Sequence, residues 1–190
     1  MKTPKKSPKP KTLKGRVLIQ VVTGSIAAYK AADLTRVLRD AGAKVYCVMT
    51  PGAKHFVTPL VLRAVSGERV FDDFFSVQTD HGVLHTELAE KADAILVAPA
   101  SADFIAKLAC GMADDLASCL ILAVRKPVVI VPAMNDHMYQ HPLTQENMQK
   151  LERIGYRFVQ PAVGRLVCGK ESVGHIADPA RILSVLQQSL

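Results

Sequence analysis

Short apolar runs alternate with helix-like stretches along most of the chain. Five runs rich in β-branched residues predict buried strands, at 17–22, 44–49, 94–97, 128–131 and 157–159. Apolar residues at helical spacing predict helices between and after them, at about 26–40, 53–65, up to 109, 114–124, 142–154 and 179–188. Near-continuous apolar strands separated by helices are typical of a parallel sheet covered on both faces. We therefore predict a single three-layer α/β domain, flavodoxin-like or Rossmann-like, without internal repeats.

The loop after the first predicted strand is the first candidate for ligand binding, because ligands of such sheets bind outside the carboxyl ends of the strands. Residues 23–26 (TGSI) place a glycine and a hydroxyl at the start of a helix. Free backbone N–H groups and the helix dipole favour a phosphate there. The alternative is that Ser25 caps the helix by accepting a bond from a first-turn amide. The sequence contains neither the GxGxxG pattern nor a P-loop.

The later loops carry small and amide side chains. Thr50 offers a hydroxyl at a second helix start, which taken alone is an ordinary turn. Residues 98–103 (APASAD) include no bulky side chain, which suits the approach of a planar ring and equally suits tight helix–sheet packing. Asn135 follows the fourth strand, where its amide can donate to a carboxylate. An Asx turn or a helix cap is the alternative for that asparagine.

The histidines and cysteines do not by themselves indicate which reaction the protein catalyses. His85 lies ahead of the third predicted strand, and five other histidines compete with it. The four cysteines match neither a disulfide framework nor a zinc spacing, and no metal site is expected. Cys47, Cys110 and Cys119 fall in predicted strands and helices, where buried thiols are common. Cys168 lies in a glycine-bounded loop (GRLVCG, 164–169) before the last helix, where a thiol can be reactive.

The charge of the chain is concentrated at its start. The 190 residues are 49% hydrophobic and carry a net charge of +7. Seven of the 24 Lys and Arg residues lie within 1–16, and the other 17 balance the 17 acids. We therefore expect residues 1–15 to be a disordered basic tail and 16–190 to be a neutral folded domain that binds no nucleic acid. Without a signal-peptide pattern or a membrane-spanning apolar run, a cytoplasmic location is expected.

Six motifs occur in one order along the chain and give it a family resemblance. They are TGSIAAYKA (23–31), HTEL (85–88), ADAILVAPASAD (92–103), KLACGMADDL (107–116), PAMN (132–135) and GRLVCG (164–169). Together they resemble the flavin-dependent cysteine decarboxylase family, and most of all its phosphopantothenoylcysteine-decarboxylating branch. The similarity covers about nine-tenths of the chain, and PAMN with the later Cys-Gly is its most specific pair.

The resemblance implies a cofactor, an assembly and a set of site residues. The cofactor is FMN, held at a subunit interface of a homotrimer that in some members assembles further into a dodecamer. The family's FMN contacts fall on Gly24, Ser25, Ile26, Thr50, Ser101, Ala102, Asp103, Phe104 and Ala133. Its catalytic histidine falls on His85, its substrate-binding segment on Met134 and Asn135, and its reductive cysteine on Cys168.

The implied reaction is FMN-dependent decarboxylation of 4′-phosphopantothenoylcysteine to 4′-phosphopantetheine in coenzyme A biosynthesis. One alternative is an oxidative decarboxylase of C-terminal peptidyl cysteine, which stops at the enethiol and generally lacks the residue that falls on Cys168. Another is a flavin-binding regulatory subunit that inhibits a phosphatase, for which the basic tail is the only support. Two departures from the family pattern stand out: the segment 170–176 (KESVGHI) lacks a glycine, the usual Arg or Ala and the methionine, and Asp103 replaces a common asparagine.

Overall fold

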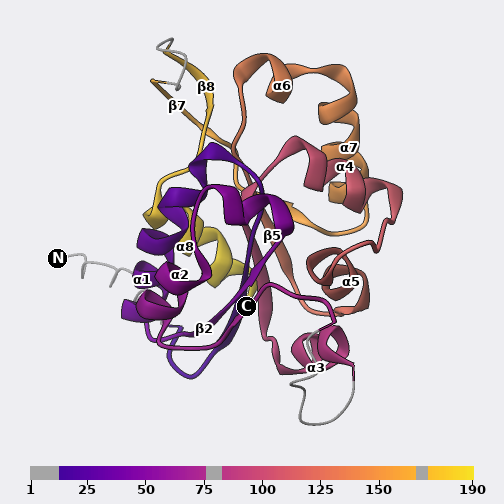
Figure 1. The fold of residues 1–190 in the computed structure, drawn as a ribbon. Coiled ribbons are helices and arrows are strands. Elements are labelled where there is room, and N and C mark those ends of the chain that lie inside the picture. Colours follow the sequence, from indigo (N-terminus) through magenta and orange to yellow (C-terminus); the bar gives the residue numbers. More distant parts are fainter. Residues whose placement is uncertain (1–12, 76–82, 166–170) are drawn as a thin grey trace, which may run out of the picture.

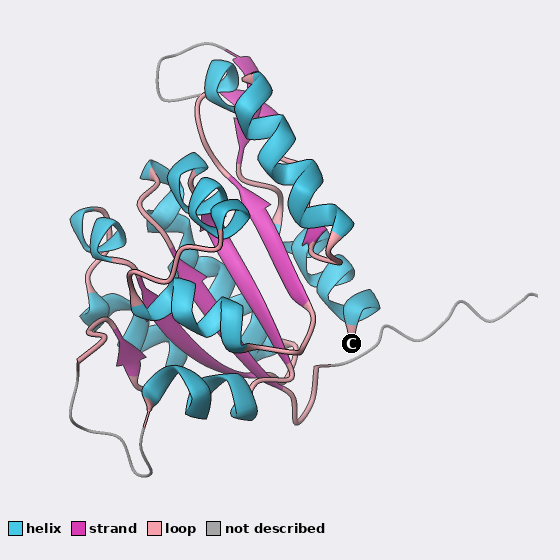
Figure 2. Cartoon of the chain, turned by 90° about the vertical axis from the view of Figure 1, so that its right-hand side faces the viewer, coloured by secondary structure: helices cyan, strands magenta, loops and turns pink. Residues whose placement is uncertain are grey.

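A six-stranded parallel sheet crosses the middle of the molecule in the computed structural model, which describes residues 13–75, 83–165 and 171–190 (Figures 1 and 2). Its strands lie side by side in the order β3 (Val70–Phe71), β2 (Lys44–Met49), β1 (Val17–Val22), β4 (Ala94–Ala100), β5 (Val128–Pro132) and β6 (Arg157–Phe158). This is the Rossmann-type order, one of the two kinds that the sequence predicts. The order reverses between β1 and β4, so their carboxyl ends form the switch point at which such sheets bind ligands.

Helices cover both faces of the sheet (Figure 1). One face carries the short helices η1 (Ile26–Lys30) and η2 (Pro51–His55) with α1 (Ala31–Asp40), α2 (Pro59–Ser66) and α8 (Pro179–Ser189). The other carries α3 (Leu84–Lys91), α4 (Ala102–Cys110), α5 (Leu116–Ala123) and α7 (Pro142–Arg153). Alternate β1 residues enter the two apolar cores, Leu18 on the first face and Ile19 on the second. Both faces are buried, which explains why the strand reads as a continuous apolar run.

The elements that the sequence did not reveal are short or weakly patterned. They are the two-residue strand β3, helix α3, the five-residue helix α6 (Asp136–Gln140), and an antiparallel hairpin of β7 (Ala162–Arg165) and β8 (Glu171–His175). The loop predicted at 164–169 therefore begins inside β7. The helix predicted at 26–40 is also two pieces, the 3₁₀ turn η1 followed by α1. Elements this short show too little periodicity to be recognised.

The packed body begins before the predicted boundary at residue 16. Leu13 is buried in the first core, and its N–H donates to the Ala41 carbonyl at 3.0 Å. The predicted basic tail falls mainly in residues 1–12, which lie outside the described residues. Among the helices of the described residues, none has the length and apolar character needed to cross a membrane.

Candidate functional site

The loops after β1 and β4 are tied together at the switch point. The Thr23 hydroxyl donates to the Pro99 carbonyl at 2.8 Å and accepts from the Ser101 backbone N–H at 2.9 Å. Thr23 is fully buried, so both bonds are shielded from water. A hydroxyl that donates to one loop segment and accepts from its neighbour fixes their spacing. The two loops that the family resemblance assigns to the cofactor therefore form one rigid unit.

The loops after β1 and β2 approach each other through two glycines. A Cβ atom added to Gly24 would lie 3.3 Å from backbone atoms of Gly52, and a Cβ on Gly52 would lie 3.3 Å from the Gly24 Cα. Side chains at either position would push the loops apart. The exposed backbone at Gly24, which carries no side chain, suits the close approach of a ligand's phosphate.

Ser25 takes the capping role that was its sequence alternative, and Thr50, predicted only as part of a turn, also caps a helix. The Ser25 hydroxyl accepts from the Ala27 N–H at 3.3 Å and also donates to the Ala133 carbonyl at 2.9 Å. The Thr50 hydroxyl accepts from the Ala53 N–H at 3.3 Å. Through its second bond, Ser25 joins the loop after β1 to the loop after β5. Capping and assembly of the site are thus combined in one side chain.

The start of α4 presents small and acidic groups beside the switch point. Ser101 caps this helix by accepting from the Phe104 N–H at 3.2 Å, and the Phe104 side chain is buried in the second core. Ala102 is half-buried, and Asp103 is exposed. The pKa of Lys107 is raised, chiefly by its hydrogen bond to Asp114, with a further contribution from the charge of Asp103. Asp103 therefore has a cationic neighbour that offsets its negative charge.

Asn135 stands exposed at the end of β5, directly before α6. Its Oδ1 accepts from the His137 N–H at 2.9 Å, which is the cap that the sequence allowed as an alternative. The half-buried Met134 is held by a bond from its N–H to the Gly174 carbonyl at 3.1 Å, so strand β8 packs against this loop. Gly174 has φ +128°, and a Cβ there would lie 2.2 Å from the Met134 carbonyl oxygen. Only glycine permits this contact.

His85 lies far from these loops in the same chain. It belongs to α3, which sits at the opposite end of the sheet from α6 and the β7–β8 hairpin (Figures 1 and 2). Its ring stacks on Phe74 with a centroid separation of 6.0 Å. The Nδ1 atom is buried and has no hydrogen-bond partner among the described residues. A buried ring nitrogen without a partner is unusual and calls for an explanation.

The cysteines separate into buried and accessible thiols. Burial raises the pKa of Cys47 to about 12, which keeps this strand thiol protonated and unreactive, as its position predicts. Cys110 is exposed at the end of α4, whereas the sequence placed it among buried thiols. Cys168 lies outside the described residues, within the connection between β7 and β8. The described part of the chain contains no cluster of side chains suited to a metal ion.

Sequence reasoning missed one buried polar residue that supports the site. Gln20 lies in the apolar run of β1 and donates through Nε2 to the Ala31 and Ala98 carbonyls at 3.2 and 3.4 Å. Its Oε1 accepts from the Thr35 hydroxyl at 2.8 Å. A lone amide inside an otherwise apolar strand was the available signal, since buried polar groups require partners.

Known proteins share this architecture and sequence. A family model described as Flavoprotein matches residues 6–190. The coenzyme A biosynthesis bifunctional protein CoaBC of Vibrio vulnificus (strain YJ016) is 45% identical over 177 residues, which are 93% of this chain and 44% of that protein. CoaBC of Escherichia coli (strain K12) is 42% identical over 174 residues, which are 92% of this chain and 43% of that protein. The chain thus spans less than half the length of these relatives.

Solved structures of similar fold lead to the same family. A PPC decarboxylase mutant complexed with pantothenoylaminoethenethiol has a TM-score of 0.83 and 31% identity, covering 91% of this chain and 97% of that one. The FMN-dependent cysteine decarboxylase SpaF has a TM-score of 0.82 and 30% identity, covering 94% and 97%. The family model, the sequence relatives and the shared fold agree with one another, so the chain belongs to the flavoprotein family of PPC decarboxylase-like, FMN-dependent cysteine decarboxylases.

Proposed function

We propose that this protein uses FMN to decarboxylate 4′-phosphopantothenoylcysteine to 4′-phosphopantetheine. The observation that carries the proposal is the exposed amide of Asn135, fixed at the sheet end beside the small-residue loops. Because Oδ1 is occupied by the His137 N–H, the two Nδ2 hydrogens remain to donate to a substrate carboxylate. The similarity to CoaBC proteins supports the choice of substrate.

The hydrogen-bond donors of these loops support FMN as the cofactor. Among the described residues, none accepts a hydrogen bond from the backbone N–H groups of Gly24 and Ile26. These two N–H groups would hold the phosphate of the cofactor, since free amides at a helix start favour an anion. Ala102 and Ala133 leave room for a flat ring system nearby. The solved FMN-binding protein AtHal3, 31% identical with a TM-score of 0.81, supports this cofactor.

Bound FMN would supply the two-electron oxidation and reduction that a cysteine carboxylate needs in order to leave. The protein's own groups would hold the substrate and move protons. Asn135 would orient the carboxylate toward the cofactor and hold it there. Cys168 would donate the proton needed when the enethiol is reduced by two electrons to the saturated product, the step that distinguishes this reaction from purely oxidative decarboxylation.

His85 would serve the site of a second copy of the chain. Its helix α3 lies at the opposite end of the sheet from α6, which directly follows Asn135, so we infer that His85 acts in another chain (Figure 1). Exposed apolar side chains support association through two different surfaces. One set lies on η1 and on the η2–α2 segment, namely Ile26, Tyr29, Phe56, Leu60 and Val61, and another lies near α3, namely Phe75, Val83 and Leu122. Two unlike surfaces that meet head to tail generate a closed ring, such as the expected homotrimer.

A peptidyl-cysteine decarboxylase is the second candidate. The departures at 170–176 fall partly in β8, the strand that contacts the Asn135 loop, and SpaF shares the fold at 30% identity. Altered residues in β8 can therefore change which substrate binds beside Asn135. The third alternative, a regulatory subunit, rests on the basic tail alone, which falls mainly outside the described residues.

The deciding experiment is a mass spectrum of products after incubation of the FMN-loaded protein with 4′-phosphopantothenoylcysteine. Loss of CO2 alone is expected, because the carbon–carbon bond breaks and a proton replaces the carboxylate. Loss of CO2 and two hydrogens would show that only the oxidative half proceeds, which favours the peptide alternative. Unchanged substrate in a visibly yellow protein would refute the coenzyme A assignment.

A further inference from the structure

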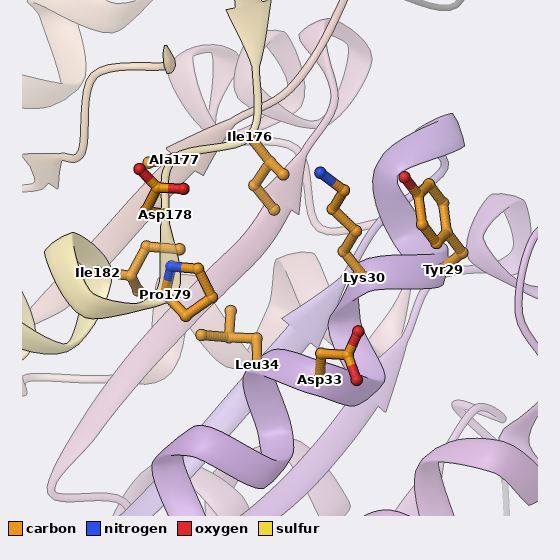
Figure 3. Close-up of a pocket in the computed structure, with 9 residues that line it drawn as sticks. All are labelled: Tyr29, Lys30, Asp33, Leu34, Ile176, Ala177, Asp178, Pro179 and Ile182. Carbon is orange, nitrogen blue, oxygen red and sulfur yellow. The ribbon is translucent and has the colours of Figure 1, made fainter. Parts of the chain in front are cut away.

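A pocket beside β8 plays no part in the site described so far. It lies between the η1–α1 segment and the start of α8, below the β7–β8 hairpin (Figure 3). Its wall is apolar at Leu34, Ile176 and Ile182, all of which belong to the first core or its edge. One side carries the ammonium group of Lys30, which reaches toward Ile176 in Figure 3. The pocket thus combines an aliphatic wall with a single cation.

Lys30 is held in place by a neutral partner. Its Nζ lies 2.9 Å from the Nε2 of His175. The His175 Nδ1 faces the Ile176 carbonyl at 3.1 Å, which assigns the ring hydrogen to Nδ1 and leaves Nε2 to accept from Lys30. This contact uses one of the three Lys30 ammonium hydrogens and leaves two. Within the part of the chain that the structure describes, no carboxylate forms an ion pair with Lys30.

Two carboxylates also line the pocket and restrict where an anion can bind. Asp33 lies 3.8 Å from Arg36, which compensates part of its charge. Asp178 is exposed at the start of α8, across the pocket from Lys30 (Figure 3). Repulsion by Asp178 disfavours an anion at the α8 side, whereas Asp33 lies on the η1–α1 segment, which also carries Lys30 (Figure 3). The Lys30–His175 side remains as the place for negative charge.

The pocket is connected to the Asn135 loop through β8. His175 follows Gly174, whose carbonyl accepts from the Met134 N–H at 3.1 Å. One peptide step and one side chain therefore separate the backbone contact with the Asn135 loop from the Lys30–His175 pair. A pantothenoyl arm of about eleven bonds between cysteine Cα and phosphorus extends to about 14 Å, which allows its two ends to bind at separate features of this face.

We propose that this pocket binds the phosphate monoester end of the substrate, with Lys30 as the charged donor and His175 as the residue that positions it. This inference rests on the proposed function, since it assumes a substrate anchored by its carboxylate at Asn135. The ammonium group binds phosphate as a point charge, and the aliphatic wall accepts the branched carbons of the arm. Lys30 is thus a specificity determinant for phosphorylated over unphosphorylated substrates.

The first test compares kcat/KM for phosphopantothenoylcysteine and for pantothenoylcysteine, which lacks the phosphate. Loss of a charged hydrogen bond in Lys30→Met is expected to lower the preference for the phosphorylated substrate about tenfold or more. Lys30→Arg should keep part of the preference for the phosphorylated substrate. Lys150→Met is the matched control, because it removes the same charge from an exposed site on α7. An unchanged preference in Lys30→Met, with FMN still bound, would overturn the proposal.

The second test does not require turnover. Inorganic phosphate is titrated into the FMN-loaded protein by calorimetry, and binding is expected in wild type and Lys150→Met but weakened in Lys30→Met. Equal binding by all three proteins, or none by wild type, counts against the pocket. Binding that depends on Lys30 without any effect on substrate preference would mean a site for free phosphate, which also overturns the assignment. If neither cysteine compound is decarboxylated, this titration decides the pocket separately from the proposed function.

Discussion

The position of His85 yields a quantitative prediction about subunit complementation. Helix α3, which contains His85, lies at the opposite end of the sheet from α6, which directly follows Asn135 (Figure 1). Each site of the proposed trimer would therefore take its histidine from one copy and its asparagine from the next. His85→Asn and Asn135→Asp should each be nearly inactive alone at low substrate concentration. When the two variants are mixed in one trimer, one site receives both native residues.

The size of the recovery follows from counting. With equal amounts of the two variants, about three-quarters of trimers are mixed, and each mixed trimer contains one intact site of three. Recovered activity should therefore be about a quarter of wild type. The assay is co-expression of the two variants with different tags, purification through both tags, and measurement of CO2 release. Because double-tag purification removes unmixed trimers, the purified sample should reach about a third of wild type.

A site built within one chain predicts a different result. In that case every site in the mixture lacks either His85 or Asn135, and mixing recovers nothing. The same null result in a protein that gel filtration shows to be a trimer would refute the shared-site reasoning. The control is co-expression of two differently tagged His85→Asn chains, which should stay inactive in either case.

Three further changes follow from the local geometry. Asn135→Asp should raise KM about tenfold or more in steady-state kinetics, because the new carboxylate repels that of the substrate. An unchanged KM would show that Asn135 does not bind the substrate carboxylate. Gly174→Ala places a Cβ 2.2 Å from the Met134 carbonyl oxygen, so it should lower Tm and raise KM more than Gly111→Ala, which meets no atom within 4 Å. The pKa of Asp93 is lowered, chiefly by the backbone N–H that it accepts, so this carboxylate stabilises the fold above its ordinary pKa near 4. Asp93→Asn should therefore lose about 1 kcal/mol or less at pH 7 in denaturant unfolding, and the difference should vanish as the pH falls through the lowered pKa of Asp93.

The sequence predicted most of the sheet because a strand buried on both faces has a continuous run of apolar residues. The runs at 17–22 and 44–49 coincide with β1 and β2, since both faces of those strands are covered. The candidate loops followed from the same pattern, because parallel strands present their carboxyl ends at one edge. The two readings of Ser25 and Asn135 could not be separated by spacing. The structure shows both residues as caps, and the cap leaves the Asn135 amide hydrogens available.

The positions of elements that are far apart in the sequence could not be predicted from the sequence. Nothing in the HTEL motif indicates that α3 packs against α5 and lies away from the other site loops, because that position depends on tertiary contacts of a helix with weak periodicity. Strands β7 and β8 were not predicted, because they are only four and five residues long and show little periodicity. Their pairing register is also irregular near Ala162. The contact between Gly174 and Met134 joins segments forty residues apart, and it became visible only in three dimensions.

Gln20 shows how the fold holds a site made largely of backbone and small residues. Its amide is completely buried, so each of its polar atoms must find a partner or destabilise the fold. The partners it finds are the start of α1 and the strand β4, the two elements whose loops meet at Thr23. A hydrophobic residue at position 20 would leave the Ala31 and Ala98 carbonyls without this link. The polar network beneath the loops therefore sets their relative position, which glycines and alanines at the surface cannot do for themselves.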